Sequence, residues 1–222
     1  MSTLAYATSV TPPHAGLISL KAYRGPKILL LNNKGGVGKS TLTTQLLLRL
    51  QQRGQHPALV DFDPQCSSLQ WAEQHGAIWA VDDDARRAPL ESMRLRVPAN
   101  ASCVLMDSPA NLTPELLVRV LRYADKILLP SQANPMDVRA LGRFLPELLF
   151  HPMYRSRQPK IGVVANRVQD GSQTELLKRF LTHLDMPLLA ELPERSQYQQ
   201  DHAASKLSDN GVWARLLEWL DQ

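Results

Sequence analysis

The stretch Asn33-Lys34-Gly35-Gly36-Val37-Gly38-Lys39-Ser40-Thr41 decides the fold of this 222-residue chain. It follows the short apolar run Ile28 to Leu31 and opens an amphipathic segment, which is the context of a phosphate-binding loop between a strand and a helix. Glycines let successive backbone N–H groups curl around phosphate oxygens without a Cβ in the way. A helix that begins near Ser40 adds the positive end of its dipole. The stretch therefore predicts a binding site for a polyphosphate group.

The side chains of this loop suit a bound triphosphate and its metal ion. Lys39 would reach the β- and γ-phosphates as a catalytic cation, and the Ser40 hydroxyl would hold Mg²⁺. A merely flexible Gly-rich loop is disfavoured because the glycine spacing, Lys-Ser-Thr, the strand and the helix occur together. The other expected nucleotide-binding residues of the loop are Gly35, Gly36, Val37, Gly38 and Thr41.

One position departs from the ordinary eight-residue motif, which begins with glycine. This loop lacks that glycine and carries Lys34 directly before Gly35, so it resembles the deviant Walker A box of the ParA/MinD family of ATPases. The resemblance implies ATP as the nucleotide and a lysine that reaches across a nucleotide-sandwich homodimer to the partner's phosphates. Lys34 would then neutralise transition-state charge in trans. The alternative is a surface lysine beside a phosphate site.

Two acidic residues follow the next apolar run, in Leu59-Val60-Asp61-Phe62-Asp63-Pro64-Gln65. The segment is similar to an Asp-x-Asp-Pro-Gln segment of the family. The resemblance implies that Asp63 positions or activates the attacking water and that Asp61 supports the Mg²⁺ shell. Strand alternation predicts that both carboxylates face one cavity. Ordinary surface aspartates at a strand end are the alternative.

A third motif, Val104-Leu105-Met106-Asp107-Ser108-Pro109-Ala110, is again an apolar run that ends in an aspartate. It resembles the Walker B strand of the family and the switch that follows it. Asp107 would accept hydrogen bonds from Mg²⁺-bound water. The segment Ser108-Pro109-Ala110 would sense the γ-phosphate.

Weaker resemblances continue toward the C-terminus. Asn134-Pro135-Met136-Asp137 looks like a family loop near the nucleotide and the dimer face. Val163-Val164-Ala165-Asn166-Arg167 resembles the strand end whose asparagine contacts adenine, and this gives Asn166 that role, with a turn-capping Asn as the alternative. Glu194-Arg195-Ser196-Gln197-Tyr198 resembles a late segment near the base.

Alternation of short apolar runs with helical patterns predicts an α/β fold with a mainly parallel β-sheet flanked by helices on both faces, a P-loop NTPase of the deviant Walker A type. The expected strands are Lys27–Asn32, Ala58–Phe62, Ser102–Met106, Lys126–Leu129, Lys160–Ala165 and Pro187–Ala190. The expected helices are Ser40–Arg53, Pro114–Tyr123, Met136–Leu149, Thr174–Leu184 and Val212–Leu220.

The two ends of the chain differ in pattern. Residues 1–26 contain Pro12, Pro13 and Gly16, so we expect a loosely ordered extension, and residues 27–222 suit a single ATPase domain. The final segment Val212–Leu220 places its apolar residues on one helical face. A core-packed helix is favoured over a membrane anchor because Glu218 and Asp221 would be repelled by anionic lipid.

Composition narrows the class of protein. The two cysteines, Cys66 and Cys103, provide neither a disulfide framework nor Cys-x-x-Cys spacing. No apolar run approaches the roughly 18 residues needed to cross a bilayer. We therefore expect a cytoplasmic protein with no stable membrane insertion.

Charge is unevenly distributed along the chain. Between Arg119 and Arg179 stand eleven basic residues against five acidic ones. Such an excess suits a surface that meets polyanions, although ordinary solvated arginines would give the same count. The candidates for non-specific contacts to double-stranded DNA are Arg155, Arg157, Lys160, Lys178 and Arg179.

The resemblance as a whole is to compact ParA-type partition ATPases. It implies slow ATP hydrolysis stimulated by an adaptor protein, an ATP-bound homodimer, association with the nucleoid, and positioning of a plasmid, a chromosome region or a protein assembly. A MinD-like switch at a membrane surface and a metabolic or cluster-transfer enzyme remain as alternatives.

Overall fold

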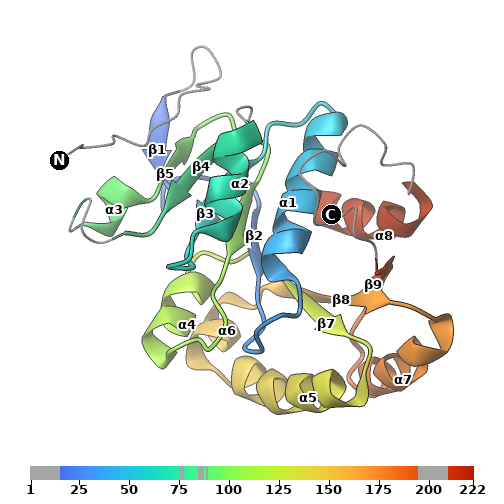
Figure 1. Cartoon of the computed structure of the whole chain (residues 1–222). Helices are drawn as coiled ribbons and strands as arrows, with labels where there is room; N and C mark the ends of the chain where they lie inside the picture. The colour runs from blue at the N-terminus through green and yellow to red at the C-terminus, as the bar shows by residue number, and fades with distance from the viewer. Residues whose placement is uncertain (1–15, 76–77, 85–87, 89, 195–209) are drawn as a thin grey trace.

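A seven-stranded parallel sheet forms the centre of the described structure (Figure 1). The computed structural model describes residues 16–75, 78–84, 88, 90–194 and 210–222. Every neighbouring pair of strands in this sheet runs parallel. In spatial order the strands are β4 (Trp79–Asp82), β3 (Ala58–Asp61), β6 (Val104–Asp107), β2 (Lys27–Leu30), β7 (Lys126–Gln132), β8 (Lys160–Val168) and β9 (Leu188–Pro193).

Helices cover both faces of the sheet. The first face carries α1 (Lys39–Gln52), α2 (Ser67–His75) and α8 (Asn210–Asp221), and the second carries α4 (Pro114–Leu121), α5 (Pro135–Leu149), α6 (Pro152–Arg157) and α7 (Glu175–His183). Two short helical segments complete the description, α3 (Glu91–Arg94) and the 3-10 turn η1 (Gly171–Thr174).

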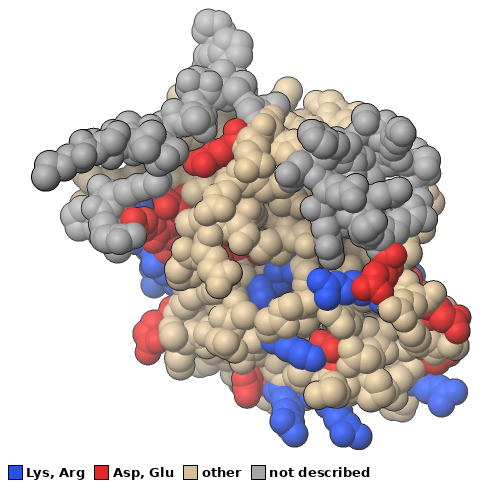
Figure 2. Space-filling view, in the orientation of Figure 1, with Lys and Arg blue, Asp and Glu red and all other residues tan. Residues whose placement is uncertain are grey.

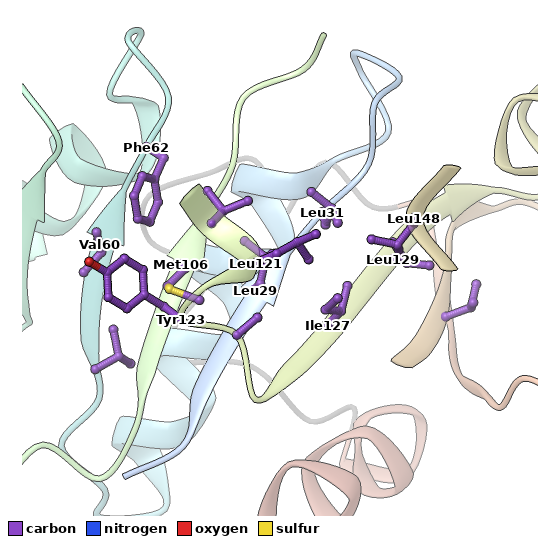
Figure 3. Packing of buried hydrophobic residues seen from close by; sticks show 14 of the residues in the cluster. Leu29, Leu31, Val60, Phe62, Met106, Leu121, Tyr123, Ile127, Leu129 and Leu148 are labelled. Carbon is purple, nitrogen blue, oxygen red and sulfur yellow. The ribbon is translucent and has the colours of Figure 1, made fainter. Parts of the chain in front are cut away.

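Strand β2 shows how one strand serves two cores. Ile28 and Leu30 contribute to the core under α1 and α8, whereas Leu29 contributes to the core under α4 and α5. Figure 3 shows Leu29 with buried side chains of neighbouring strands and with Leu121 and Leu148 from the second face. Strands buried on both sides are nearly continuous apolar runs. The predicted α/β fold with helices on both faces is therefore confirmed.

The six strands and five helices predicted from the sequence are all present, with shifted ends. The prediction missed the helices α2, α3 and α6 and the strands β4, β1 (Leu17–Ser19) and β5 (Arg96–Pro98). The first three residues of β4, Trp79 to Val81, are half-buried at the edge of the sheet, so they form no continuous apolar run. Helix α2 buries only Ser68, Leu69 and Ala72, which is too little apolar surface for a clear helical period.

A two-stranded antiparallel ribbon ties the start of the described chain to its middle. Strand β1 (Leu17–Ser19) pairs with β5 (Arg96–Pro98). Leu20 and Tyr23 follow β1 and are buried in the core of the second face. Residues 17–23 thus depart from the expected loosely ordered extension, because β1 is paired with β5 and the side chains of Leu20 and Tyr23 are buried. The earlier part of that extension lies outside the described residues.

Helix α8 packs into the core of the first face. Trp213 and Leu216 are buried, and the Arg49 guanidinium lies 3.7 Å from the centre of the Trp213 ring. The Lys126 ammonium donates to the carbonyl oxygen of Trp219 at 3.1 Å, which places a cation at the negative end of the helix. The prediction of a core-packed final helix is confirmed. In the described part of the chain, no helix combines the length and the apolar character needed to cross a membrane.

Candidate nucleotide site

The loop between β2 and α1 has a backbone that depends on glycine. Gly36 has φ 75° and Gly38 has φ 93°, both in the left-handed region. A Cβ on Gly38 would also come within 2.1 Å of the amide nitrogen of Asn166, so no larger residue fits there. Gly38 precedes α1 and supplies no side-chain hydrogen bond to it. The first N–H groups of the helix are thus left to bind an anion.

A cavity of about 730 Å³ opens at this loop, at the carboxyl edge of the sheet. This size and this position are typical of ligand sites in open α/β sheets. In the view of Figure 2, basic side chains lie near the centre of the molecular surface. The predicted residues that line the cavity are Gly35, Gly36, Gly38, Lys39, Ser40, Thr41 and Asp63, with Pro109 and Ala110 from the segment after β6.

Lys39 lies at the base of the cavity with its ammonium group directed back at the loop. The Nζ atom donates to the carbonyl oxygen of Asn32 at 3.1 Å. Burial lowers the pKa of Lys39, and the negative charges of Asp107 and Asp63 act in the opposite direction. A bound triphosphate would strengthen that second effect and hold the lysine charged.

Asp107 ends β6 and is fully buried. Neither carboxylate oxygen has a hydrogen-bond partner among the described residues. Burial raises the pKa of Asp107 to about 7 and the nearby charge of Asp61 adds to the rise, whereas the Ser40 and Ser68 hydroxyls lower it without full hydrogen-bond geometry. An unsatisfied buried carboxylate beside a serine hydroxyl fits a hydrated Mg²⁺, which prefers oxygen ligands and keeps several waters.

Asp61 and Asp63 share one hollow, as strand alternation predicted, and Asp63 also reaches a second one. Both line a smaller hollow of about 220 Å³, but of the two only Asp63 also lines the cavity at the glycine loop. The Asp61 carboxylate accepts from the Ser68 hydroxyl at 2.6 Å and from the Leu69 N–H at 3.0 Å, so it is directed at the start of α2. The strand β3 ends at Asp61, so Asp63 lies just beyond it. A support role for Asp61 at the metal thus stays a prediction.

Lys34 points away from the cavity of its own chain. Its Nζ atom lies 2.8 Å from a carboxylate oxygen of Asp137, near the start of α5. The Asp137 side chain is 3% exposed, whereas the Lys34 side chain is 37% exposed. The second Asp137 oxygen has no partner among the described residues. This ion pair therefore holds an accessible lysine on a buried carboxylate.

Asn166 contacts the glycine loop itself. Its amide nitrogen donates to the Val37 carbonyl oxygen at 2.8 Å, and its amide oxygen accepts from the Arg167 N–H at 3.0 Å. The Val37 side chain is buried, so its part in the site is through the backbone. An adenine contact by Asn166 stays a prediction. The late segment expected near the base lies outside the described residues after Glu194.

Two residues of the site had no role assigned from the sequence. Arg167 lines the cavity and has φ 55°, a left-handed conformation that is uncommon for arginine. Asp137 is the partner of Lys34 although 103 positions separate them. No local pattern could have found this pair, because the sheet order brings the two segments together.

The basic residues chosen as DNA candidates lie on three elements, α6, β8 and α7. Lys178 of α7 pairs with Glu191 of β9 at 2.9 Å. Arg157 pairs with Asp125 at 2.9 Å, and Lys160 begins β8 at the amino edge of the sheet, opposite the cavity. Arg155 and Arg179 stand on α6 and α7.

Comparisons with known proteins agree with this geometry. The chain is 35% identical over 114 residues to maintenance of carboxysome distribution protein A of Gloeobacter kilaueensis, an alignment that covers 51% of this chain and spans about half (52%) of that relative. It is 27% identical over 167 residues to the protein of the same name from Halothiobacillus neapolitanus, covering 73% of this chain and 76% of the relative.

A solved structure has the same fold. The ATP complex of a substituted McdA from Cyanothece superposes with a TM-score of 0.63 at 17% identity and covers 90% of this chain and 96% of that one. The family model described as "CobQ/CobB/MinD/ParA nucleotide binding domain" matches residues 28–206, from β2 to beyond β9. The chain belongs to this family of ParA/MinD-type nucleotide-binding proteins.

Proposed function

We propose that this protein is an ATP-dependent dimerising switch ATPase that positions a cargo through ATP-dependent, non-specific DNA binding. The observation that carries the proposal is the orientation of Lys34. Its side chain is partly exposed, and its ammonium group pairs with Asp137 rather than lining the cavity of its own chain. Such a lysine is available to the nucleotide of a second copy.

The predicted site residues would have separate roles in phosphoryl transfer. Bound Mg²⁺ and ATP would supply the bond to be broken and much of the charge neutralisation. The first turn of α1 and Lys39 would bind the phosphates, while Ser40 and Asp107 would hold the hydrated metal ion. Asp63, whose carboxylate oxygen already accepts from the Gln65 N–H at 2.9 Å, would orient the attacking water.

Lys34 of the partner copy would complete the site. Its charge would stabilise the negative charge that develops on the phosphoryl oxygens. Hydrolysis would then require the dimer, and loss of the γ-phosphate would remove the charge that keeps the two copies together. The result is slow turnover that a partner protein can accelerate.

The relatives suggest the kind of cargo. Two of them are named for carboxysome distribution, which favours a protein assembly over a plasmid or chromosome region. We infer a cytoplasmic, nucleoid-associated protein whose hydrolysis is stimulated by an adaptor bound to that assembly.

The first test is the oligomeric state by analytical ultracentrifugation. With Mg²⁺ and a non-cleavable ATP analogue the protein should sediment as a dimer, and with ADP as a monomer. A monomer under both conditions would contradict the proposal. The second measurement is the ATPase rate with and without duplex DNA.

A membrane-surface switch is the second candidate, and the structure of α8 argues against it. The apolar face of α8 is occupied by the core, so this helix offers no free apolar face to a lipid surface. Cosedimentation with anionic vesicles in the presence of ATP would favour this candidate over DNA binding.

A further inference from the structure

A second large cavity lies at the amino edge of the sheet, opposite the nucleotide site. Its volume is about 670 Å³, and it lies between the segment before β2, the end of α4 and the end of α6. Six of the described residues that line it are basic, whereas Asp125 is the one carboxylate side chain among them. These six residues are Lys21, Arg24, Lys27, Arg122, Lys126 and Arg157.

Two of these cations serve the fold. Lys27 is buried and pairs with Asp125 at 2.8 Å. Lys126 is buried and donates to the carbonyl oxygens at the end of α8. Their ammonium groups are engaged, but their charge still adds to the positive potential of the cavity.

The remaining cations are exposed at the rim. Lys21 and Arg24 have no ion-pair partner within the described residues. Arg122 makes a long pair with Glu91 at 3.6 Å, and Arg157 shares Asp125 with Lys27. One carboxylate thus serves two cations, which leaves a positive excess.

Lys160 extends the rim. It stands beside Lys126 in the register of β7 and β8, and its Nζ atom lies 3.5 Å from the backbone oxygen of Gln222, which lines the cavity. Burial lowers the pKa of Lys126, and the positive charge of Lys160 lowers it further. We name Lys21, Arg24, Arg122, Arg157 and Lys160 the amino-edge basic surface.

This crowding of like charge is unfavourable in the isolated protein and favourable next to a polyanion. The surface also lies away from the carboxyl edge, where Lys34 and the nucleotide cavity would meet a second copy. Dimerisation at that edge would leave it open to solvent.

We propose that the amino-edge basic surface is where this protein contacts the phosphate backbone of DNA. The proposal rests on the proposed function, because that function supplies DNA as the partner. Of the earlier candidates it keeps Arg157 and Lys160 and leaves out Arg155, Lys178 and Arg179. It adds Lys21, Arg24 and Arg122.

The test compares two double charge reversals by fluorescence anisotropy with a short duplex, Mg²⁺ and a non-cleavable ATP analogue. The first is Lys21→Glu/Arg24→Glu. The matched control is Arg139→Glu/Arg143→Glu, which makes the same change of net charge at two exposed positions of α5. The amino-edge variant should bind at least about tenfold more weakly, and the slope of log affinity against log salt should fall by roughly two. The affinity of the control variant for DNA should fall by less than about threefold, because the substituted charges are screened from the bound DNA.

Three further measurements keep the outcomes distinct. The thermal midpoint of each variant and the milder Lys21→Gln/Arg24→Gln change show whether lost binding reflects lost folding. If the wild-type protein binds no duplex, the DNA step of the proposed function fails. If it binds and the amino-edge variant binds equally well, this inference is overturned, and tight binding of inorganic tripolyphosphate without binding of duplex would overturn it too.

Discussion

Lys34 is predicted to serve both stability and catalysis. Replacement by alanine should leave ATP binding intact and reduce hydrolysis by roughly 100-fold or more, because the developing charge loses a cation. Equilibrium binding of a fluorescent ATP analogue and phosphate release measure the two effects. Normal hydrolysis by Lys34→Ala would remove the trans-lysine mechanism.

The same substitution leaves the buried Asp137 carboxylate without its cation. We expect a loss of about 1–3 kcal/mol of unfolding free energy, since an unsatisfied buried group costs about that much. The double variant Lys34→Ala/Asp137→Asn should recover this stability but not the hydrolysis. It therefore separates the catalytic effect from the structural one.

Substitution of Asp107 should stabilise the protein in the absence of ligand, whereas substitution of Lys34 should destabilise it. Replacing it with asparagine removes a carboxylate whose ionised form is disfavoured by burial, so the nucleotide-free protein should be stabilised at pH 8. Mg²⁺-dependent hydrolysis should be lost, because the metal loses its carboxylate. Chemical denaturation and a Mg²⁺ titration of activity test both parts, and a destabilised variant with full Mg²⁺ dependence would contradict them.

At the scale of an element, substitutions in α8 test whether it is a core helix or a membrane anchor. Leu216 is fully buried, so Leu216→Ala should cost about 2–5 kcal/mol of unfolding free energy. Glu218 is exposed on the same helix, and Glu218→Ala should change stability by less than about 0.5 kcal/mol. Urea denaturation measures both. An unchanged midpoint for Leu216→Ala, together with weaker vesicle binding, would instead indicate an anchor.

The element scale also shows why β1 and β5 escaped the sequence analysis. Each has three residues and its partner strand lies about eighty positions away, so neither produces a periodic signal. Their pairing depends on a chain reversal that no local pattern encodes. The long apolar runs of β2, β3 and β6 could be predicted because burial on both faces selects the same residue types throughout.

At the scale of the whole molecule, the pH dependence of stability reports how well solvent is excluded from the core under α1 and α8, which contains Cys103. Burial raises the pKa of Cys103 to about 11, from an ordinary value near 9. The folded thiol therefore keeps a proton that the unfolded chain loses, so stability falls as pH rises from about 9 to about 11.

The variant Cys103→Ala should lose less stability than the wild-type protein between pH 8 and pH 11. The difference should reach roughly 2 kcal/mol by pH 11, most of the roughly 2.7 kcal/mol that a two-unit shift is worth. Urea denaturation at both pH values measures it, and any constant cost of the smaller side chain cancels. Equal losses in the two proteins would show that the thiol ionises freely in the folded state.

The sequence by itself determined the glycine loop, the order of its motifs and the alternation of strands and helices. These features are local, because a phosphate-binding loop, a buried strand and an amphipathic helix each require particular residues at short spacing. Lys39, Ser40 and Asp107 could be proposed as site residues for this reason. Their proposed roles follow from the chemistry of binding a triphosphate and its metal ion.

The tertiary structure alone decided which distant groups meet. It paired Lys34 with Asp137, turned Asp61 toward α2 rather than the main cavity, and gathered cations from three segments at the amino edge. Such contacts are set by strand order and by which helix covers which face. Short-range spacing carries no record of them, because residues far apart in the chain become neighbours only when the sheet has formed.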